Sequence, residues 1–215
     1  MFNLFRSFRV LLIVYTGLSL GGCIEITEEI TIEKDESGSV TYRISSPAAG
    51  GLLSGLLSMI DPDVERGIVM ETEKLIRVLK SQKGISNIRY SLQGGQDGYF
   101  VTFDFADCTD FNTALYAMGG AKRTFLSPDY MKISKRRFKK FNFTPSLKRY
   151  LDREGLALPA PALSSNVTFR STVHTPRDIR KVKNGTRKDT RTSVQRFRIS
   201  DILDGKANTG INVRY

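Results

Sequence analysis

The chain has 215 residues, of which 40% are hydrophobic, and it carries a formal net charge of +11. This apolar content is sufficient for a folded core and argues against an intrinsically disordered protein. One histidine and two cysteines give no His–Cys ligand set for a zinc site.

The first 22 residues have the composition of a secretory signal peptide. Two arginines and no acidic residue accompany an apolar stretch at residues 10–20, which is too short for a transmembrane helix of about 20 apolar residues. The sequence Leu20-Gly21-Gly22-Cys23 resembles the lipobox of bacterial lipoproteins, in which the cysteine receives a lipid. We therefore predict a signal peptide over residues 1–22 and lipidation of Cys23. An ordinary signal peptide with a chance cysteine is the alternative.

A lipid on Cys23 would attach the mature chain to a bilayer, since each buried methylene adds about 0.8 kcal/mol of membrane affinity. Ile24 follows the cysteine, and it is not the aspartate that retains enterobacterial lipoproteins in the inner membrane. We therefore expect the outer membrane rather than the inner one. Cys108 is then the only free thiol, and its acidic sequence neighbours favour a structural, at least half-buried thiol.

The mature chain divides into an acidic and a basic half. Residues 23–120 contain 8 Lys/Arg against 15 Asp/Glu, and residues 121–215 contain 23 against 7. Such asymmetry indicates a polyanionic partner or an anionic membrane surface for the second half. Alternatively, acidic and basic strands of the two halves are neighbours in one sheet and partly neutralise each other.

The acidic half begins with "IEITEEITIE", in which apolar and polar residues alternate except at Glu28. This period of two predicts a half-buried strand, and residues 40–45 complete a hairpin. Glu28 lies on the apolar face. It is a buried functional carboxylate, a residue near the strand edge, or a group that a partner from the basic half satisfies.

An apolar, Gly-rich segment follows at residues 48–60. Its three glycines are unfavourable in a helix by about 1 kcal/mol each relative to Ala. We consider a membrane-dipping loop, a lid over an apolar pocket, and a short helix packed on the core. The candidate contact residues for an apolar ligand or membrane are Leu52, Leu53, Leu56, Leu57, Met59 and Ile60.

Helical spacing predicts a first principal helix from Asp61 to a C-cap at Gly84. Alternation then predicts strands at residues 85–92 and 99–105. "DCTDFNTALYAMGG" predicts a second principal helix, capped by Thr109 or Asp110 and ended by the glycine pair.

The basic half continues mainly in strands. "YMKISKRRFKKFNF", residues 130–143, is interpreted as one long bent strand with a bulge. Alternation at 167–174, the turn "KNGT", "SVQRFRIS" and "INVRY" predict further strands. We therefore expect a single α+β domain over residues 23–215, a mainly antiparallel sheet system of about eight short strands with two principal helices.

No sequence motif indicates catalysis, a metal or a cofactor: a P-loop, a dinucleotide fingerprint and G-x-S-x-G are all absent. We therefore expect a non-enzymatic protein without a cofactor. The basic segment resembles a nucleic-acid patch, but a lipidated chain lies outside the cytoplasm, so nucleic acid is not expected. Anionic lipid, glycolipid or an acidic envelope protein fits the charge. The candidate contact residues are Lys132, Lys135, Arg136, Arg137, Lys139 and Lys140.

Several stretches resemble a family of envelope lipoproteins of unknown function found in Bacteroidetes-type bacteria, which is distantly similar to the mycobacterial LppM-type domain. They are the lipobox, "IEITEEITIEKDESGSVTYRI", "GISNIRYSLQGGQDGYFVTFDFADCTDFNTAL" and "VHTPRDIRKVKNGT…FRISDIL". The basic middle segment departs from the family, and Arg177 replaces its usual Gly after Pro. The resemblance implies an α+β envelope domain and brings no catalytic residues.

Two hypotheses for a membrane-anchored, non-enzymatic protein follow. In the first, the domain is a receptor for an amphiphile such as a lipid or glycolipid, and its apolar segment and aromatic strands line a pocket. In the second, it docks on an acidic protein or an anionic membrane through the basic segment at residues 132–140. An envelope hydrolase, which would need converging carboxylates, is the least favoured alternative.

Overall fold

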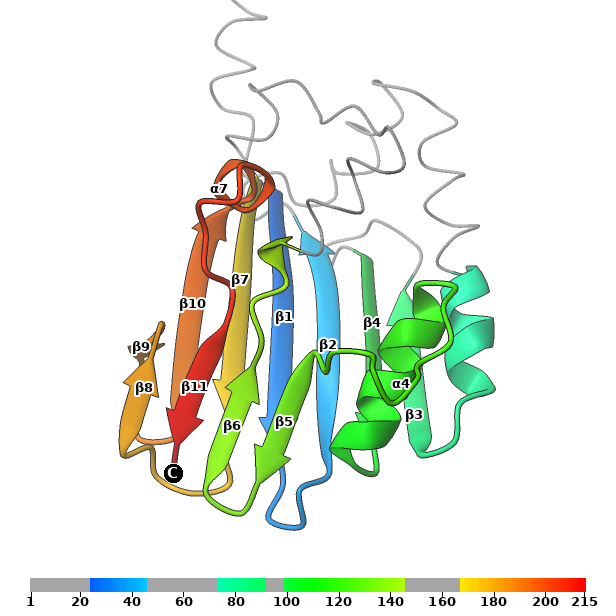
Figure 1. Ribbon diagram of the computed structural model, residues 1–215, viewed down its shortest axis with the longest axis horizontal. Coiled ribbons are helices and arrows are strands. Elements are labelled where there is room, and N and C mark those ends of the chain that lie inside the picture. Colours follow the sequence, from blue (N-terminus) through cyan, green and yellow to red (C-terminus); the bar gives the residue numbers. More distant parts are fainter. Residues whose placement is uncertain (1–23, 46–72, 92–98, 146–166) are drawn as a thin grey trace, which may run out of the picture.

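The computed structural model describes residues 24–45, 73–91, 99–145 and 167–215, and these residues form two sheets and adjoining helices (Figure 1). The predicted α+β class with mainly antiparallel sheets is confirmed. The described residues contain eleven strands rather than about eight, because three short strands extend the set. The predicted apolar segment at residues 48–60 and Cys23 lie outside the described residues.

The larger sheet has seven strands in the order β3-β4-β2-β1-β7-β10-β9. β1 and β7 are parallel although more than 130 residues separate them, and all other neighbours are antiparallel. The acidic half therefore meets the basic half in the middle of this sheet. The strands are β1 (Ile24–Ile32), β2 (Gly38–Ser45), β3 (Ile85–Ser91), β4 (Tyr99–Phe105), β7 (Val167–His174), β9 (Thr186–Arg187) and β10 (Thr192–Arg198).

The smaller sheet has four strands in the order β5-β6-β11-β8 and lies over one face of the larger sheet (Figure 1). Its strands are β5 (Met131–Ser134), β6 (Arg137–Lys140), β8 (Lys181–Lys183) and β11 (Ile211–Arg214). The prediction of one long bent strand at residues 130–143 was wrong. The chain reverses at Lys135 and Arg136, so that segment is a hairpin of β5 and β6.

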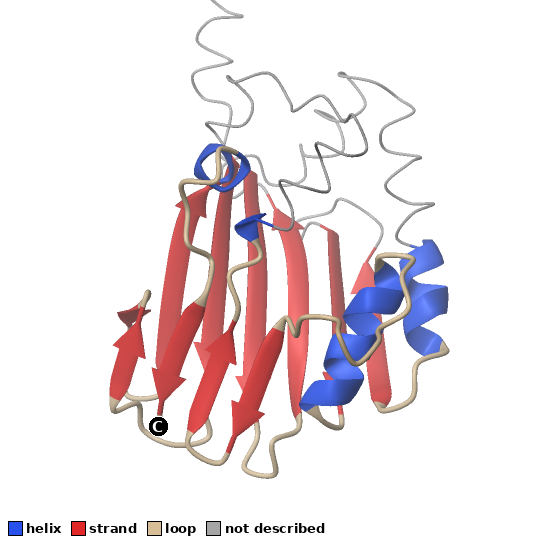
Figure 2. Ribbon diagram, viewed as in Figure 1, coloured by secondary structure: helices blue, strands red, loops and turns tan. Residues whose placement is uncertain are grey.

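Helices complete the layer that covers the larger sheet beside β5 (Figure 2). α4 (Cys108–Met118) begins with Asp107, whose carboxylate accepts the N–H of Asp110, so the predicted caps Thr109 and Asp110 were wrong. Residues 73–80 are helical, and Gly84, with a φ of +70°, forms the turn into β3 instead of a helix cap. α7 (Ile199–Leu203) follows β10.

The core lies between the two layers. Its members come from both sheets and both longer helices, and they include Ile30, Leu79, Phe111, Phe138 and Val213. Among the described residues, no helix is both long and apolar enough to cross a membrane.

Candidate functional site

A row of polar side chains crosses the inner face of the larger sheet. Glu28 of β1 is paired with Tyr42 of β2 and with Ser171 of β7, and Ser171 is paired with Gln195 of β10. Residues paired across a sheet point to the same face, so this row faces the smaller sheet. Glu28, Ser171 and Gln195 are buried. The row therefore brings a carboxylate into the core.

Lys140 of β6 lies opposite this carboxylate. Its ammonium forms an ion pair with Glu28, and neither side chain is accessible to solvent. Lys140 Nζ donates to Ser171 Oγ at 2.6 Å, and Ser171 donates to Glu28 Oε2 at 2.6 Å. The hydroxyls of Tyr130 and Tyr42 donate to Glu28 Oε1 at 2.5 and 3.4 Å. These five residues, Glu28, Tyr42, Tyr130, Lys140 and Ser171, form what we call the Glu28 cluster.

The sequence allows three interpretations of Glu28, and the structure supports the one in which the carboxylate has a partner from the basic half. That partner is Lys140. Burial alone would raise the pKa of Glu28, but the Lys140 charge and the hydrogen bonds from Lys140, Ser171 and Tyr130 hold that pKa below its ordinary value. Burial and the Glu28 charge raise the pKa values of Tyr42 and Tyr130 well above the usual range. Glu28 is therefore ionised and both tyrosines are neutral at neutral pH.

A chain of aromatic rings passes beside the cluster, from α4 to β7. Neighbouring ring centroids are separated by 6.1 Å between Phe111 and Tyr130, by 5.9 Å between Tyr130 and Phe143, and by 5.9 Å between Phe143 and Phe169. Lys140 Nζ lies 5.5 Å from the centre of the Phe169 ring. Such contacts add cation–π attraction to the ion pair.

A cavity of about 400 Å³ opens between these rings and the two longer helices. Its wall is apolar apart from the two tyrosines, whose hydroxyls are bound to Glu28. This volume is within the range of small-molecule sites, which are mostly apolar with a few polar groups. The lining residues are Tyr42, Leu75, Leu79, Val101, Leu115, Met118, Tyr130, Phe143 and Phe169.

A second hollow of about 280 Å³ also has Tyr130 and Phe143 in its wall. Leu115, Tyr130 and Phe143 line both spaces. The two spaces are therefore neighbours.

The outer face of the smaller sheet presents two rows of cations. Ser134, Arg137, Arg214 and Lys181 are paired in one row, and Lys132, Lys139, Asn212 and Lys183 in the next. These rows alternate with the inward rows that hold Phe138 and Lys140, so all six cations point outward. Among the described residues, neither row contains a carboxylate. We call the six cations Lys132, Arg137, Lys139, Lys181, Lys183 and Arg214 the basic face.

The residues predicted to contact an anionic surface differ in their exposure to solvent. Lys132, Lys135, Arg136 and Arg137 are exposed and Lys139 is half-buried, so their predicted role stays open. The prediction for Lys140 was wrong, because Lys140 is only 1% exposed and its charge is bound to Glu28. Two lysines of the basic face are partly fixed: Lys132 pairs with Asp129 at 3.1 Å, and Lys139 Nζ lies 4.3 Å from the Phe141 ring centre.

The outer face of the larger sheet differs, since two of its arginines and its histidine lie beside glutamates. Arg170 and Arg196 lie 3.0 and 3.5 Å from the Glu25 carboxylate, and His174 lies 2.8 Å from Glu29. The alternative in which acidic and basic strands of the two halves are neighbours is therefore confirmed for this sheet. It does not account for the basic face.

Cys108 is the half-buried structural thiol that we predicted. Its Sγ donates to the Met131 carbonyl at 3.1 Å, and burial raises its pKa to about 11. The thiol is therefore unreactive at neutral pH. Within the described ranges, no group of three or more His, Cys, Asp or Glu side chains could hold a metal ion.

Sequence reasoning did not identify which basic residue is the partner of Glu28 or which aromatic residues form the cavity wall. A usable signal existed for the first: Glu28 and Lys140 are opposite charges that each interrupt an apolar face. No comparable signal marks Tyr130 and Phe143, because aromatic residues of a cavity wall and of a filled core have the same spacing.

No protein-family model matches this chain, and no curated protein matches it. A solved structure, the NMR structure of the folded domain of Mycobacterium tuberculosis LppM, is similar with a TM-score of 0.39, 14% sequence identity and coverage of 90% of each chain. This neighbour is of the type to which the sequence motifs show a distant resemblance. The similarity is weak, and neither fold nor function is transferred from it.

We predict strong thermodynamic coupling between Glu28 and Lys140. Breaking a buried ion pair by removing one partner costs about 3–5 kcal/mol, because the other charge stays buried and unpaired. Glu28→Gln and Lys140→Met should each lower the free energy of unfolding by about this amount at pH 7, and the double variant should lose less than the sum. Chemical denaturation of the four proteins measures the coupling.

The partly exposed pair Glu25–Arg170 is the control for this cycle, with an expected coupling of about 1 kcal/mol or less. Additive losses for Glu28 and Lys140 would contradict the assignment. The lowered pKa of Glu28 also means that the stabilisation is present above the unfolded-state pKa, about 4.3, and is lost as the pH falls through the folded-state value. Glu28→Gln should remove this part of the acid sensitivity.

Proposed function

We propose that this chain is a lipid-anchored envelope protein that binds an amphiphile, such as a lipid or glycolipid, without transforming it. The observation that carries the proposal is the apolar cavity of about 400 Å³, closed on one side by two tyrosine hydroxyls that are fixed to a buried carboxylate. An apolar chain fits such walls, because it leaves no polar group of its own unpaired in the cavity.

The position of the predicted lipid supports this proposal. Cys23 directly precedes β1, so its Cα lies about 3.8 Å from that of Ile24. Ser45 at the end of β2 is paired with Glu25, and Val167 at the start of β7 is paired with Ile24. Ser45 and Val167 therefore lie at the end of the sheet that the lipid of Cys23 would hold at a membrane.

The cavity lies in the same half of the larger sheet. Among its lining residues, Phe169 is paired with Ile26 and Tyr42 with Glu28, both within the first five residues of β1. An amphiphile that enters from the bilayer would thus travel only a short distance. The apolar segment at residues 48–60, which lies outside the described residues, remains a predicted lid or membrane contact.

We predict that filling the cavity abolishes amphiphile binding. Leu115→Trp places an indole in the space that Leu115 lines and should weaken binding of a dansyl-labelled fatty acid at least tenfold. Leu126→Trp, the same change at a residue that is 78% exposed, should leave binding unchanged. Fluorescence titration measures both. Equal affinity in the two variants, with unchanged melting temperatures, would refute the cavity as the binding site.

We predict that Cys23→Ser leaves the chain without lipid and either unprocessed or soluble, because no other thiol lies at the predicted cleavage site. Mass spectrometry of the mature protein and membrane fractionation measure lipidation and anchoring. The wild-type protein should fractionate with the outer membrane. A substituted protein that reaches its normal mature size and stays membrane-bound would contradict the lipobox assignment.

The basic face favours a second function, docking on an anionic surface. Like charges in neighbouring strands destabilise a sheet, and the facing cations Arg170 and Arg196 of the larger sheet share the Glu25 carboxylate. Six cations on the smaller sheet are kept without carboxylates in their rows. An anionic surface would neutralise them together, and acidic lipid or an acidic envelope protein provides one.

We predict that Arg137→Gln with Lys139→Gln weakens binding of the unlipidated protein to phosphatidylglycerol vesicles. Each basic residue near such a surface contributes about 1 kcal/mol, so affinity should fall about thirtyfold at low salt. The control Arg187→Gln with Lys188→Gln removes two charges outside the basic face and should change affinity little. Vesicle co-sedimentation measures both, and a similar loss in the two variants would exclude the basic face as the docking surface.

A further inference from the structure

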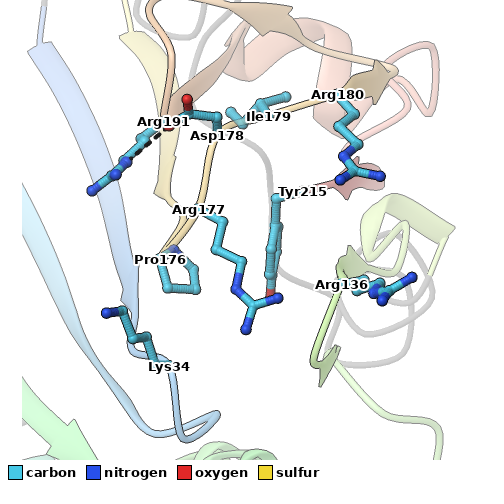
Figure 3. A pocket seen from close by; sticks show the side chains of 9 residues that line it. All are labelled: Lys34, Arg136, Pro176, Arg177, Asp178, Ile179, Arg180, Arg191 and Tyr215. Carbon is cyan, nitrogen blue, oxygen red and sulfur yellow. Dashed lines mark hydrogen bonds and ion pairs between the residues drawn. The ribbon is translucent and has the colours of Figure 1, made fainter.

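We propose that a cleft at the end of the sandwich opposite Cys23 binds a ligand with two or more phosphate groups. The cleft has a volume of about 650 Å³ and is separate from the amphiphile cavity, with which it shares no lining residue. Figure 3 shows the side chains that surround it. They are Lys34, Arg136, Pro176, Arg177, Asp178, Ile179, Arg180, Arg191 and Tyr215.

Cations dominate this cleft. Five of the nine lining residues are Lys or Arg, and Asp178 is the one carboxylate side chain among them. Asp178 pairs with Arg191 at 3.0 Å. Among the described residues, no carboxylate lies within ion-pair distance of Lys34, Arg136, Arg177 or Arg180. Positive charges still outnumber negative charges in the cleft if one negative charge is also counted for a carboxylate at Tyr215.

The cleft is built on a fixed backbone. Arg180 N–H donates to the Arg214 carbonyl at 2.8 Å, and Tyr215 N–H donates to the Arg136 carbonyl at 3.0 Å. The buried Thr175 hydroxyl donates to the Arg177 carbonyl at 2.8 Å. The main chain that carries three of the arginines is therefore held in place before any ligand binds. This preorganisation lowers the entropic cost of binding.

The residue types favour phosphate among anions. Four of the five cations are arginines, whose planar guanidinium donates two parallel hydrogen bonds to two oxygens of one phosphate. A concave site lined by charges of one sign also concentrates counter-ions from solution. The chemistry of the cleft is therefore that of a phosphate receptor.

The arrangement of the cations favours more than one phosphate. In Figure 3, Lys34 and Arg191 lie on one side of the cleft, Arg136 and Arg180 lie on the other, and Arg177 lies between them beside Tyr215. The volume exceeds that of one phosphate many times, since a water molecule occupies about 30 Å³ in the liquid. A ligand with two linked phosphates reaches more of these groups than a single phosphate does.

The position of the cleft makes this site different from the proposed amphiphile site. Lys34 follows the end of β1, and nine residues of strand extend about 30 Å from the residue that follows Cys23. The cleft therefore lies at the end of the domain that points away from the lipid attachment. The phosphates can belong to a free phosphate compound or to the headgroup of a lipid that this end meets.

Calorimetric titration of the full chain in detergent with sodium pyrophosphate tests the proposal. Arg177→Gln with Arg180→Gln should weaken pyrophosphate binding at least tenfold at 100 mM salt. Arg137→Gln with Lys139→Gln removes the same charge from the basic face and should change affinity less than twofold. Citrate, a multiply charged tricarboxylate, should bind at least tenfold more weakly than pyrophosphate.

A second arm replaces pyrophosphate with detergent micelles that contain phosphatidic acid. Binding that depends on Arg177 and Arg180 in the pyrophosphate arm supports a free phosphate compound, and the same dependence only with micelles supports a lipid headgroup. If neither arm depends on these two arginines more than on Arg137 and Lys139, the proposal fails. Citrate that binds as tightly as pyrophosphate would also overturn it. Neither result bears on the cavity at Leu115, which is tested separately.

Discussion

Glu28 and Lys140 form an ion pair between the two sheets, out of contact with water. Either charge without the other would be buried and unpaired, which would destabilise the fold. Removing both charges from water is costly, and the ion pair offsets that cost only with additional hydrogen bonds, which Ser171, Tyr130 and Tyr42 provide. A slip of one residue in either strand would move the charge to the outer face. The pair therefore specifies the register of β1 and β6 and the stacking of the sheets.

This requirement explains how charge is distributed over the molecule. The acidic strand β1 lies in the middle of the larger sheet, where Glu28 meets Lys140 of β6, and its outward Glu25 and Glu29 lie beside Arg170, Arg196 and His174 of the neighbouring basic strands. No acidic strand borders the smaller sheet among the described residues. Its outer face and the cleft around Arg177 therefore retain the positive charge that the composition shows.

Sequence periodicity predicted much of this fold, and its failures have physical causes. The alternation of residues 24–33, interrupted at Glu28, gives β1 correctly, because a half-buried strand has one face in the core and one face in solvent. The hairpin at residues 130–143 was predicted as a single strand for two reasons. Its tight turn consists of Lys135 and Arg136 and contains no Gly, Pro or Asn. In addition, Lys140 points inward, where alternation predicts an apolar residue. A pocket lined by aromatic strands was one hypothesis, but its position and its lining residues could not be predicted. Tyr130 and Phe143 could line a cavity or fill a core. The outcome depends on the distances between secondary-structure elements, which a local sequence pattern does not contain.

The Glu28 cluster also limits how the cavity can change. The hydroxyls of Tyr42 and Tyr130 are bound to Glu28, so these rings cannot turn away from the cavity without leaving a buried charge short of a donor. The opposite wall, formed by residues such as Leu79 and Met118, is apolar. Packing of this kind is non-directional and readjusts at lower cost than a satisfied polar network. The apolar wall can therefore readjust at lower cost than the tyrosine wall.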